Sequence, residues 1–436
     1  MDKYQDKLSD MVAYAYRHTA FYRDLYAKAG VRPNAENMAA IFSSLPIVTK
    51  KDVLDRSADF LSDEYDKTEL LHDRTSGSTG KILDIYWNKK QHIRSLMSLW
   101  SRRHQRFGIM PDSKCVFFHS IAYRENSGFD DEGNDVSEAA RQVFSPHIML
   151  RENGIVLSLS KLDFSERALN TYYRYIVQFE PEWMMGHPST VLLLARHMQS
   201  HGLPPIKSLK YIELAGEFLQ PAYRTAIEEI MQVPTANEYG AREVNGIAFE
   251  CAEGHLHVMP RNVHVEIIED GVPVPMGEPG HVCITGLNNK AMPFVRYDLG
   301  DRGRLLPGES CSCGNVHPIL EVQAGRGNEL ITRPDGTYVE CVIMFYAVEA
   351  VNAYLDQCIL QFRAIQKDVS NFELQIVVPA DRQSDELDRQ IRACFLEALR
   401  PYGFGDTHWT FTYWKEITPD TETGKLNFFI NRMVSL

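Results

Sequence analysis

The 436-residue sequence lacks the features that would take a chain into or across a membrane. Residues 1–7 are polar and contain no apolar core, so we expect no signal peptide. No run of about 18 apolar residues predicts a membrane span. The eight cysteines are sparse for this length, which makes a disulfide framework improbable. We therefore expect a protein of a reducing cytoplasm.

The sequence also has no excess of positive charge, no internal repeat and no low-complexity tract. Its formal net charge of −12 argues against a general nucleic-acid binder, because phosphate contacts need basic patches. A local basic pocket for a nucleotide stays compatible with this charge. What is present is a globular composition, 44% hydrophobic and 24% charged. The length suits two or three domains of about 100–200 residues each.

A run of small residues before a lysine, RTSGSTGKILD at 74–84, is the first candidate site. A Walker A loop needs glycine at its first position and Ser or Thr after the lysine. Thr75 and Ile82 stand at these two positions, so the P-loop interpretation fails. Backbone N–H groups and hydroxyls in such a run can still surround an anion. The alternative is an ordinary Ser/Gly-rich turn.

Apolar spacing predicts an α/β protein of two parts. The large N-terminal domain, 1–326, is expected to have mostly parallel sheets and a β-rich subdomain at 262–324. The C-terminal domain, 327–436, is expected to be a small mobile α+β unit. Helices are predicted within 1–45, after Pro46, and at 167–179, 188–201 and 221–231; strands are predicted at 82–87, 154–159 and 209–214. The acidic segment 122–140 is a substrate lid or a solvated insertion.

Four further motifs follow in order: EYGARE at 238–243, FVRYDLGD at 294–301, GRGNELI at 325–331 and TPDTETGK at 418–425. Together with the run at 75–81 they resemble the adenylate-forming acyl-CoA synthetase superfamily. HTAFYRDLYAKAG and LPIVTKKDV within 13–55, GHLHV at 254–258 and CSCG at 311–314 resemble its phenylacetate–CoA ligase-like branch, which includes capsular-polysaccharide and coenzyme F390 synthetase types. The resemblance covers nearly the whole chain and is weakest at 115–160.

The resemblance implies an enzyme that joins a carboxylate to ATP, releases pyrophosphate and passes the acyl group to a thiol. Lys425 would bridge carboxylate and phosphate, Glu243 would hold Mg²⁺, and Asp301 would accept the ribose hydroxyls. Tyr239 would lie against adenine. The residues implied to hold ATP are Thr75, Ser76, Gly77, Ser78, Thr79, Gly80, Lys81, Gly216, Glu217, Glu238, Tyr239, Gly240, Asp301 and Arg326.

Two positions depart from the family pattern. Arg242 stands where the family has Thr, and it could contact the α-phosphate or turn away into a salt bridge. Asn328 stands at the hinge position, where the family usually has Asp. By position, the acid site would draw on Phe118, His119, His187 and Ala215. Aromatic residues there suit an aryl acid, and core packing explains them equally well.

Cysteine and histidine residues suggest a second site. Cys251, His257, Cys311 and Cys313 form a Cys₃His set of the kind that holds structural zinc, and the resembling branch shows a similar pattern. His255 is the rival imidazole. The alternative is that the four residues are unconnected, with thiols buried as small hydrophobic groups.

The sequence therefore indicates an acid–thiol ligase that forms AMP and uses ATP, Mg²⁺, CoA and structural Zn²⁺. An acyl carrier protein with a phosphopantetheine arm is the alternative acceptor. A non-catalytic binder of an adenylate or aryl ligand is the alternative from another class. The expected substrate is a small carboxylic acid, with an aryl acid as the first candidate. We expect no nucleic-acid or membrane partner, and a homodimer is left open.

Overall fold

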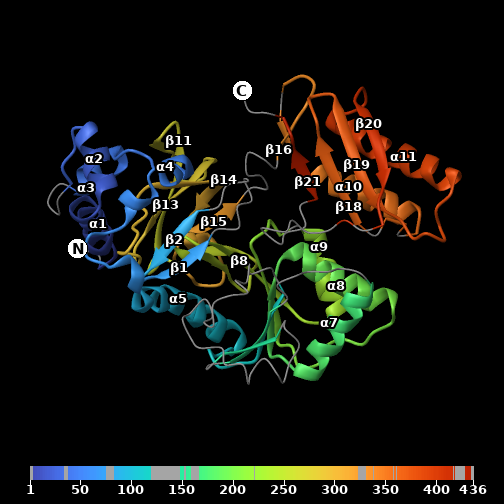
Figure 1. Ribbon diagram of the computed structural model, residues 1–436, viewed down its shortest axis with the longest axis horizontal. Helices are drawn as coiled ribbons and strands as arrows, with labels where there is room; N and C mark the ends of the chain where they lie inside the picture. Colours follow the sequence, from blue (N-terminus) through green and yellow to red (C-terminus); the bar gives the residue numbers. More distant parts are fainter. Residues whose placement is uncertain are drawn as a thin grey trace. The chain divides into compact units, whose positions relative to one another are not determined.

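The computed structural model describes residues 3–33, 38–74, 83–118, 148–151, 154–158, 166–219, 221–322, 330–336, 338–356, 358–359, 361–415, 417 and 428–433. The chain divides into two compact units. The first is Met1–Lys161 with Glu166–Gln323, and the second is Leu162–Ser165 with Ala324–Leu436. Among the helices of the described ranges, none combines the length and apolar character needed to cross a membrane. Figure 1 gives the element labels.

The first unit begins with short helices, as predicted for this part of the chain. These are α1 (Lys3–His18), α2 (Ala20–Lys28), α3 (Met38–Ile41) and α4 (Lys50–Asp55). Helix α4 starts at a capping box in which Thr49 and Asp52 satisfy each other's backbone N–H groups. Strands β1 (Leu71–Arg74) and β2 (Asp84–Trp87) then pair antiparallel, with Arg74 opposite Asp84. The run at 75–81 therefore connects two paired strands instead of a strand and a helix.

One mixed sheet of 13 strands, counted over the described residues, organises the first unit. Its order is β12-β11-β13-β14-β15-β10-β9-β8-β7-β6-β3-β5-β4. Pairing is parallel only from β5 through β3, β6 and β7 to β8, and antiparallel elsewhere. The strands are β3 (Cys115–Phe118), β4 (Ile148–Arg151), β5 (Gly154–Ser158), β6 (Trp183–Gly186), β7 (Tyr211–Ala215), β8 (Thr235–Ala241), β9 (Asn245–Glu250), β10 (Leu256–Val258), β11 (Val263–Glu269), β12 (Val272–Pro273), β13 (Gly280–Gly286), β14 (Tyr297–Leu306) and β15 (Ile319–Val322). The predicted β-rich part is thus continuous with the parallel part.

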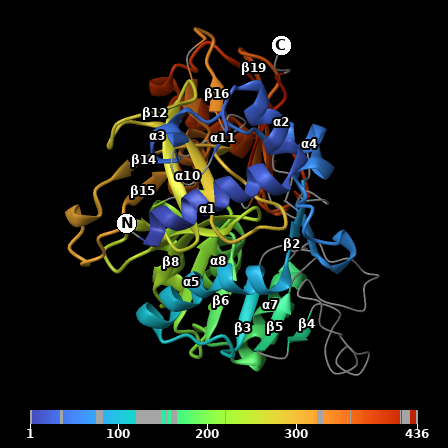
Figure 2. The same cartoon turned by 90° about the vertical axis from the view of Figure 1, so that its left-hand side faces the viewer.

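Helices cover both faces of the parallel part. Helices α7 (Glu166–Phe179), α8 (Pro188–Ser200) and α9 (Pro221–Met231) lie together on one side of the strands, and α5 (Lys89–Phe107) lies on the other (Figure 1). Figure 2 shows α5 crossing the strands. Asn88 caps the start of α5, and Gly108 ends it in a left-handed conformation. Its buried stripe is Ser95, Leu99 and Arg103, which are spaced by four residues and so share one face.

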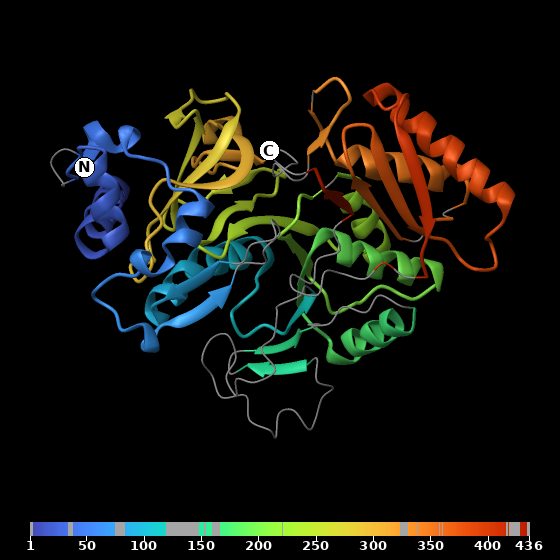
Figure 3. The ribbon, with the colours of Figure 1, turned by 45° about the horizontal axis from the view of Figure 1, so that its top comes forward.

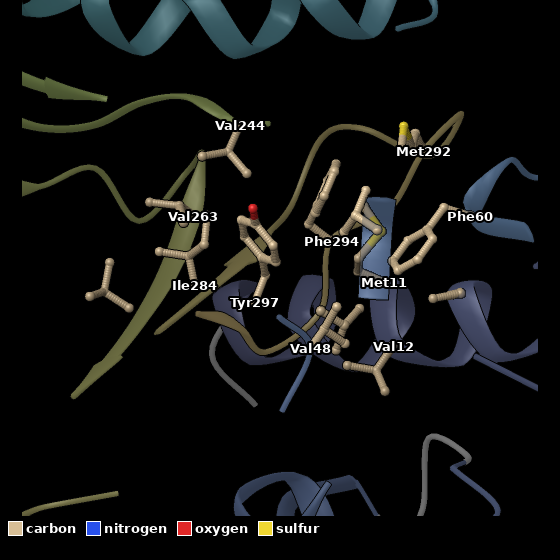
Figure 4. Close-up of a cluster of buried hydrophobic side chains, with 14 of the residues drawn as sticks. Met11, Val12, Val48, Phe60, Val244, Val263, Ile284, Met292, Phe294 and Tyr297 are labelled. Carbon is tan, nitrogen blue, oxygen red and sulfur yellow. The ribbon is translucent and has the colours of Figure 1, made fainter. Parts of the chain in front are cut away.

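Two hydrophobic clusters flank the sheet. Leu99 of α5 packs with Trp183, Tyr211, Ala236 and other apolar side chains in one cluster. The other joins the N-terminal helices to the antiparallel strands, and Figure 4 shows part of it, including Val12, Val48, Phe60, Phe294 and Tyr297. The two clusters lie on opposite faces of β8, because side chains alternate along a strand: Ala236 belongs to the first cluster and Tyr239 packs against the second.

The second unit has a four-stranded sheet in the order β20-β19-β18-β21. Its elements in the described ranges are β16 (Leu330–Thr332), β17 (Tyr338–Glu340), α10 (Val342–Tyr354), β18 (Gln361–Gln366), β19 (Asn371–Val377), α11 (Asp385–Leu399), β20 (His408–Tyr413) and β21 (Phe429–Asn431). Helix α11 buries Ile391, Phe395 and Leu399, and the centre of the Phe395 ring lies 5.0 Å from that of Trp409 on β20. Figure 3 shows the ribbon of this unit, in which helices pack against the sheet. This helix-on-sheet packing gives the unit its own core.

Candidate functional site

The segment 238–243, which comprises the end of β8 and the start of the turn to β9, is tied to β14 by two hydroxyl–carboxylate hydrogen bonds. The Tyr239 hydroxyl donates to Asp301 Oδ2 at 2.7 Å, and the Tyr297 hydroxyl donates to Glu243 Oε1 at 3.1 Å. Both carboxylates are buried. Figure 4 shows the Tyr297 hydroxyl on the side of the cluster where Val244 lies, next to Glu243. The arrangement fixes two carboxylates near the end of β8, where they can accept hydroxyl protons or hold a hard cation.

Arg242 forms a salt bridge. Its Nη1 lies 2.9 Å from Asp73 Oδ2, and the Trp87 indole donates to its carbonyl oxygen at 3.2 Å. Asp73 lies on β1, two residues before the small-residue run at 75–81. Of the two roles considered for Arg242, the structure therefore displays the salt bridge. Its effect is to join the hairpin that carries the run to the segment 238–243.

His187, Ala215 and Gly216 lie together at the carboxyl ends of β6 and β7. His187 follows β6 directly, and its Nδ1–H donates to the Ala215 carbonyl at 2.9 Å. Gly216 has φ +79, and a Cβ there would lie 2.6 Å from the His187 ring. The ring thus occupies space that only glycine leaves open. Glu217 follows, half-buried, and Phe118 ends β3 opposite Gly186. Ligands of open α/β sheets bind at this edge.

A buried ion pair joins α5 to β7, two residues before Ala215. Arg103 of α5 makes a two-pronged contact with Glu213 of β7, with Nε–Oε2 at 2.9 Å and Nη2–Oε1 at 2.6 Å. The Tyr211 hydroxyl donates to the same carboxylate at 2.8 Å. The guanidinium carbon lies within 5 Å of the centres of the Trp100 and Trp183 rings, at 4.6 and 4.8 Å. The charged end of the α5 stripe is therefore fully compensated.

The four predicted metal ligands come together in space. One ligand atom from each of Cys251, His257, Cys311 and Cys313 lies within 4.8 Å of the others. Cys251 follows β9, His257 lies on β10, and the other two precede β15. The Cys251 and Cys311 sulfurs are 3.7 Å apart, and the Cys313 sulfur is 3.3 Å from His257 Nε2.

These distances fit a tetrahedral metal site. Zn–S bonds of about 2.3 Å at tetrahedral angles place two sulfurs about 3.8 Å apart, close to the spacing of Cys251 and Cys311. His257 is buried, and its Nδ1–H donates to the His317 carbonyl at 2.8 Å, which leaves Nε2 as the nitrogen with a lone pair. His255, the rival imidazole, is exposed and lies 3.2 Å from the Cys311 sulfur through Nδ1. The geometry favours His257 as the ligand.

Comparison with known proteins finds similar chains among coenzyme A ligases. No protein-family model matches it. It is 25% identical over 395 residues to the phenylacetate–coenzyme A ligase of Thermus thermophilus, which covers 89% of this chain and 80% of that protein. It is 25% identical over 334 residues to the phenylacetate–coenzyme A ligase of Escherichia coli, covering 74% and 70%. These similarities support the predicted resemblance to the adenylate-forming acyl-CoA synthetase superfamily and to its phenylacetate–CoA ligase-like branch.

Solved structures share the fold of this chain. A 2-hydroxyisobutyryl-CoA ligase in the postadenylation state, in complex with R3-HIB-AMP, has a TM-score of 0.74 and 17% identity, with 99% of this chain and 89% of that chain covered. The anthranilate CoA ligase AuaEII in complex with anthranoyl-AMP has a TM-score of 0.52 and 17% identity, covering 89% and 74%. The predicted α/β class with a large and a small unit is confirmed.

Part of the predicted site lies outside the described residues. These parts are residues 75–81, the single residues His119, Arg326, Asn328 and Lys425, and the segment 122–140. Sequence reasoning missed four contacting residues: Asp73, Arg103, Glu213 and Tyr297. Glu213 had a readable signal, because it is a lone carboxylate inside the apolar strand run YIELA. Arg103 likewise extends an otherwise uncharged stripe of α5.

Proposed function

We propose that the chain activates a carboxylic acid with ATP and then transfers the acyl group to CoA. A carboxylate oxygen attacks the α-phosphorus, the bond to pyrophosphate breaks, and an acyl-adenylate forms. The CoA sulfur then attacks the acyl carbon, its proton passes to solvent, and AMP leaves. The observation that carries the proposal is the pair of hydrogen bonds that fixes Asp301 and Glu243 beside Tyr239, in a chain similar to phenylacetate–coenzyme A ligases.

Each residue would act through position and charge. Asp301, held by Tyr239, would accept the ribose hydroxyls, while the Tyr239 ring face would stack on adenine. Glu243 would hold Mg²⁺, which supplies positive charge against the phosphate oxygens when bound. Residues 75–81 would surround the β- and γ-phosphates, and Arg242 would keep the hairpin that carries them next to Glu243. Lys425 would bridge the two reacting anions.

The acid proposed from the relatives' names is an aryl acid. The same edge of the sheet carries His187 and Ala215, and β3 ends there with Phe117 and Phe118. An aromatic strand end beside small residues suits a flat apolar ring. The substrate's carboxylate would then face the segment 238–243.

Acid-dependent exchange of pyrophosphate into ATP, without any thiol, tests the first half-reaction. We expect exchange with at least one acid of a panel of aryl acids, amino acids and short fatty acids. Lys425→Ala should abolish exchange and leave ATP binding measurable by calorimetry, because the lysine acts on the reacting groups. Silence across the panel, with ATP bound normally, would favour a non-catalytic binder. If the acyl group is transferred to a phosphopantetheine-bearing carrier protein and not to CoA, the carrier protein is the acceptor.

We also propose that Cys251, His257, Cys311 and Cys313 hold one structural Zn²⁺. Four protein ligands close the coordination sphere, so the ion would clamp the β9–β10 turn to the segment before β15 and take no part in the reaction. Elemental analysis of the purified chain should find about one zinc per chain. His257→Ala should lose the metal, whereas the matched change His255→Ala should keep it. Equal zinc content in both variants would refute the ligand assignment.

A further inference from the structure

Glu238 lies in β8 on the face opposite to Tyr239. It is the last residue of β8 that pairs with β7, opposite Ala215 and two residues beyond the pair Glu213 and Ala236. Ala236 belongs to the cluster under α5, and Glu238 shares its face because side chains alternate. Tyr239, which contacts Asp301, packs against the other cluster. Glu238 therefore faces the side of the strand where α5 packs, away from Tyr239 and Asp301.

The Glu238 carboxyl group points toward the carboxyl end of its strand. A Cβ built at Gly240 would lie 2.4 Å from Glu238 Oε1, so the side chain runs along β8 over a glycine that leaves it room. Its register partner Ala215 carries only a methyl group. The carboxyl group thus reaches the edge where parallel sheets bind ligands.

Glu238 is buried yet has no hydrogen-bond partner among the described residues. Only 8% of its surface is exposed. Each nearby cation already has a carboxylate of its own: Arg103 pairs with Glu213, and Arg242 pairs with Asp73. Among the described residues, two cations thus face three carboxylates, and Glu238 is the one without a cation of its own. Buried carboxyl groups are normally paired, because burial without a partner is costly.

The pKa of Glu238 is shifted in the direction expected for a buried carboxyl group without a cation of its own. The pKa of the Glu238 carboxyl is raised to about 8: burial is the largest cause, the negative charge of Glu213 adds to the rise, and Arg103 and Arg242 act against it. A bound cation beside the carboxyl would reverse the effect by favouring the ionised form. When Glu238 is ionised, the described residues around it are therefore one positive charge short of balance.

We propose that Glu238 binds a protonated amine of the acid substrate. The substrate is then an acid, aryl in the simplest case, that carries a cationic amino group remote from the carboxylate to be activated. The inference rests on the proposed adenylation. It names the chemical class of the acid and makes Glu238 a specificity-determining residue. A neutral acid such as phenylacetate would leave the buried carboxyl without a partner.

Matched pairs of acids test this directly by pyrophosphate exchange. 4-(Aminomethyl)benzoate and 4-ethylbenzoate have the same shape and differ by one charge, as do 5-aminopentanoate and hexanoate. A charge-assisted hydrogen bond should give wild type a preference of about 10–100-fold in kcat/KM for the amine. Glu238→Gln should bring this ratio close to one. Glu238→Asp, which keeps the charge, should keep a preference, and exposed Glu229→Gln on α9 is the matched control.

The outcomes separate the two proposals. Exchange with neutral acids at rates equal to or above those of the amines, or a ratio that Glu238→Gln does not change, overturns the role of Glu238 and leaves the adenylation intact. If Glu238→Gln raises the KM for ATP and leaves the amine-to-neutral ratio of kcat/KM unchanged, the residue acts on the nucleotide instead, which also overturns the inference. Absence of exchange with every acid in both sets, from wild-type protein that binds ATP, refutes the adenylation itself and the inference with it.

Discussion

Removing the Arg103 guanidinium is the sharpest test of how the parallel half of the sheet is held together. Arg103→Met keeps the aliphatic length and leaves Glu213, whose side chain is fully buried, with only the Tyr211 hydroxyl. The variant also takes the cation away from the Trp100 and Trp183 rings. Because a carboxylate without its partner must be desolvated or protonated, the folded state loses more than one hydrogen bond.

The magnitude follows from the burial of the pair. Breaking a buried ion pair by removing one partner costs about 3–5 kcal/mol. The exposed pair Arg389–Glu386 on α11, with 73% and 62% of its side-chain surfaces accessible, is worth about 0–1 kcal/mol. Arg389→Met is therefore the matched control. Replacing both partners, Arg103→Met with Glu213→Leu, removes both charges and should recover much of the loss, because no charge stays unpaired.

Urea unfolding followed by tryptophan fluorescence measures these differences. Trp100 and Trp183 flank the pair, and replacing Trp409 and Trp414 of the second unit by Phe confines the signal to the first. We compare transition midpoints at unchanged slope, since a changed slope marks a different unfolding process. A loss below about 1 kcal/mol for Arg103→Met, or a double variant weaker than either single variant, would refute the reasoning.

Three other predictions concern the site. The pKa of Glu238 in the folded state is about 8, above its ordinary 4.5, so between these values the folded state holds an extra proton and stability falls as pH rises. Glu238→Gln should therefore make the melting temperature less dependent on pH between pH 5 and 8. An unchanged dependence of melting temperature on pH contradicts the assignment. Tyr239→Phe removes the donor to Asp301 and should raise the KM for ATP about 3–30-fold, and an equal KM would separate Asp301 from the ribose. Chelation should lower the melting temperature of wild type but not of Cys313→Ser, and only Zn²⁺, not Mg²⁺, should restore it.

Local patterns in the sequence were enough to predict many of the helices and strands and the similarity to phenylacetate–coenzyme A ligases. The helix after Pro46 begins where Thr49 and Asp52 form a capping box, a signal confined to four residues. The strands β5 and β7 and the helices α7, α8 and α9 lie where apolar spacing predicts them. The cysteine and histidine set could also be named in advance, because ligand types and approximate spacing are visible in one dimension. These features depend on neighbours along the chain.

Other features depend on side chains that meet only after folding. Arg242 finds Asp73 across 169 positions of sequence, and Arg103 finds Glu213 across 110. The choice of His257 over His255 follows from strand pairing, which buries one imidazole against the His317 carbonyl and exposes the other. Strand register likewise separates Glu238 from Tyr239. A sequence shows which charges and ligands exist, but long-range packing decides which of them are paired, because pairing is a matter of distance and burial.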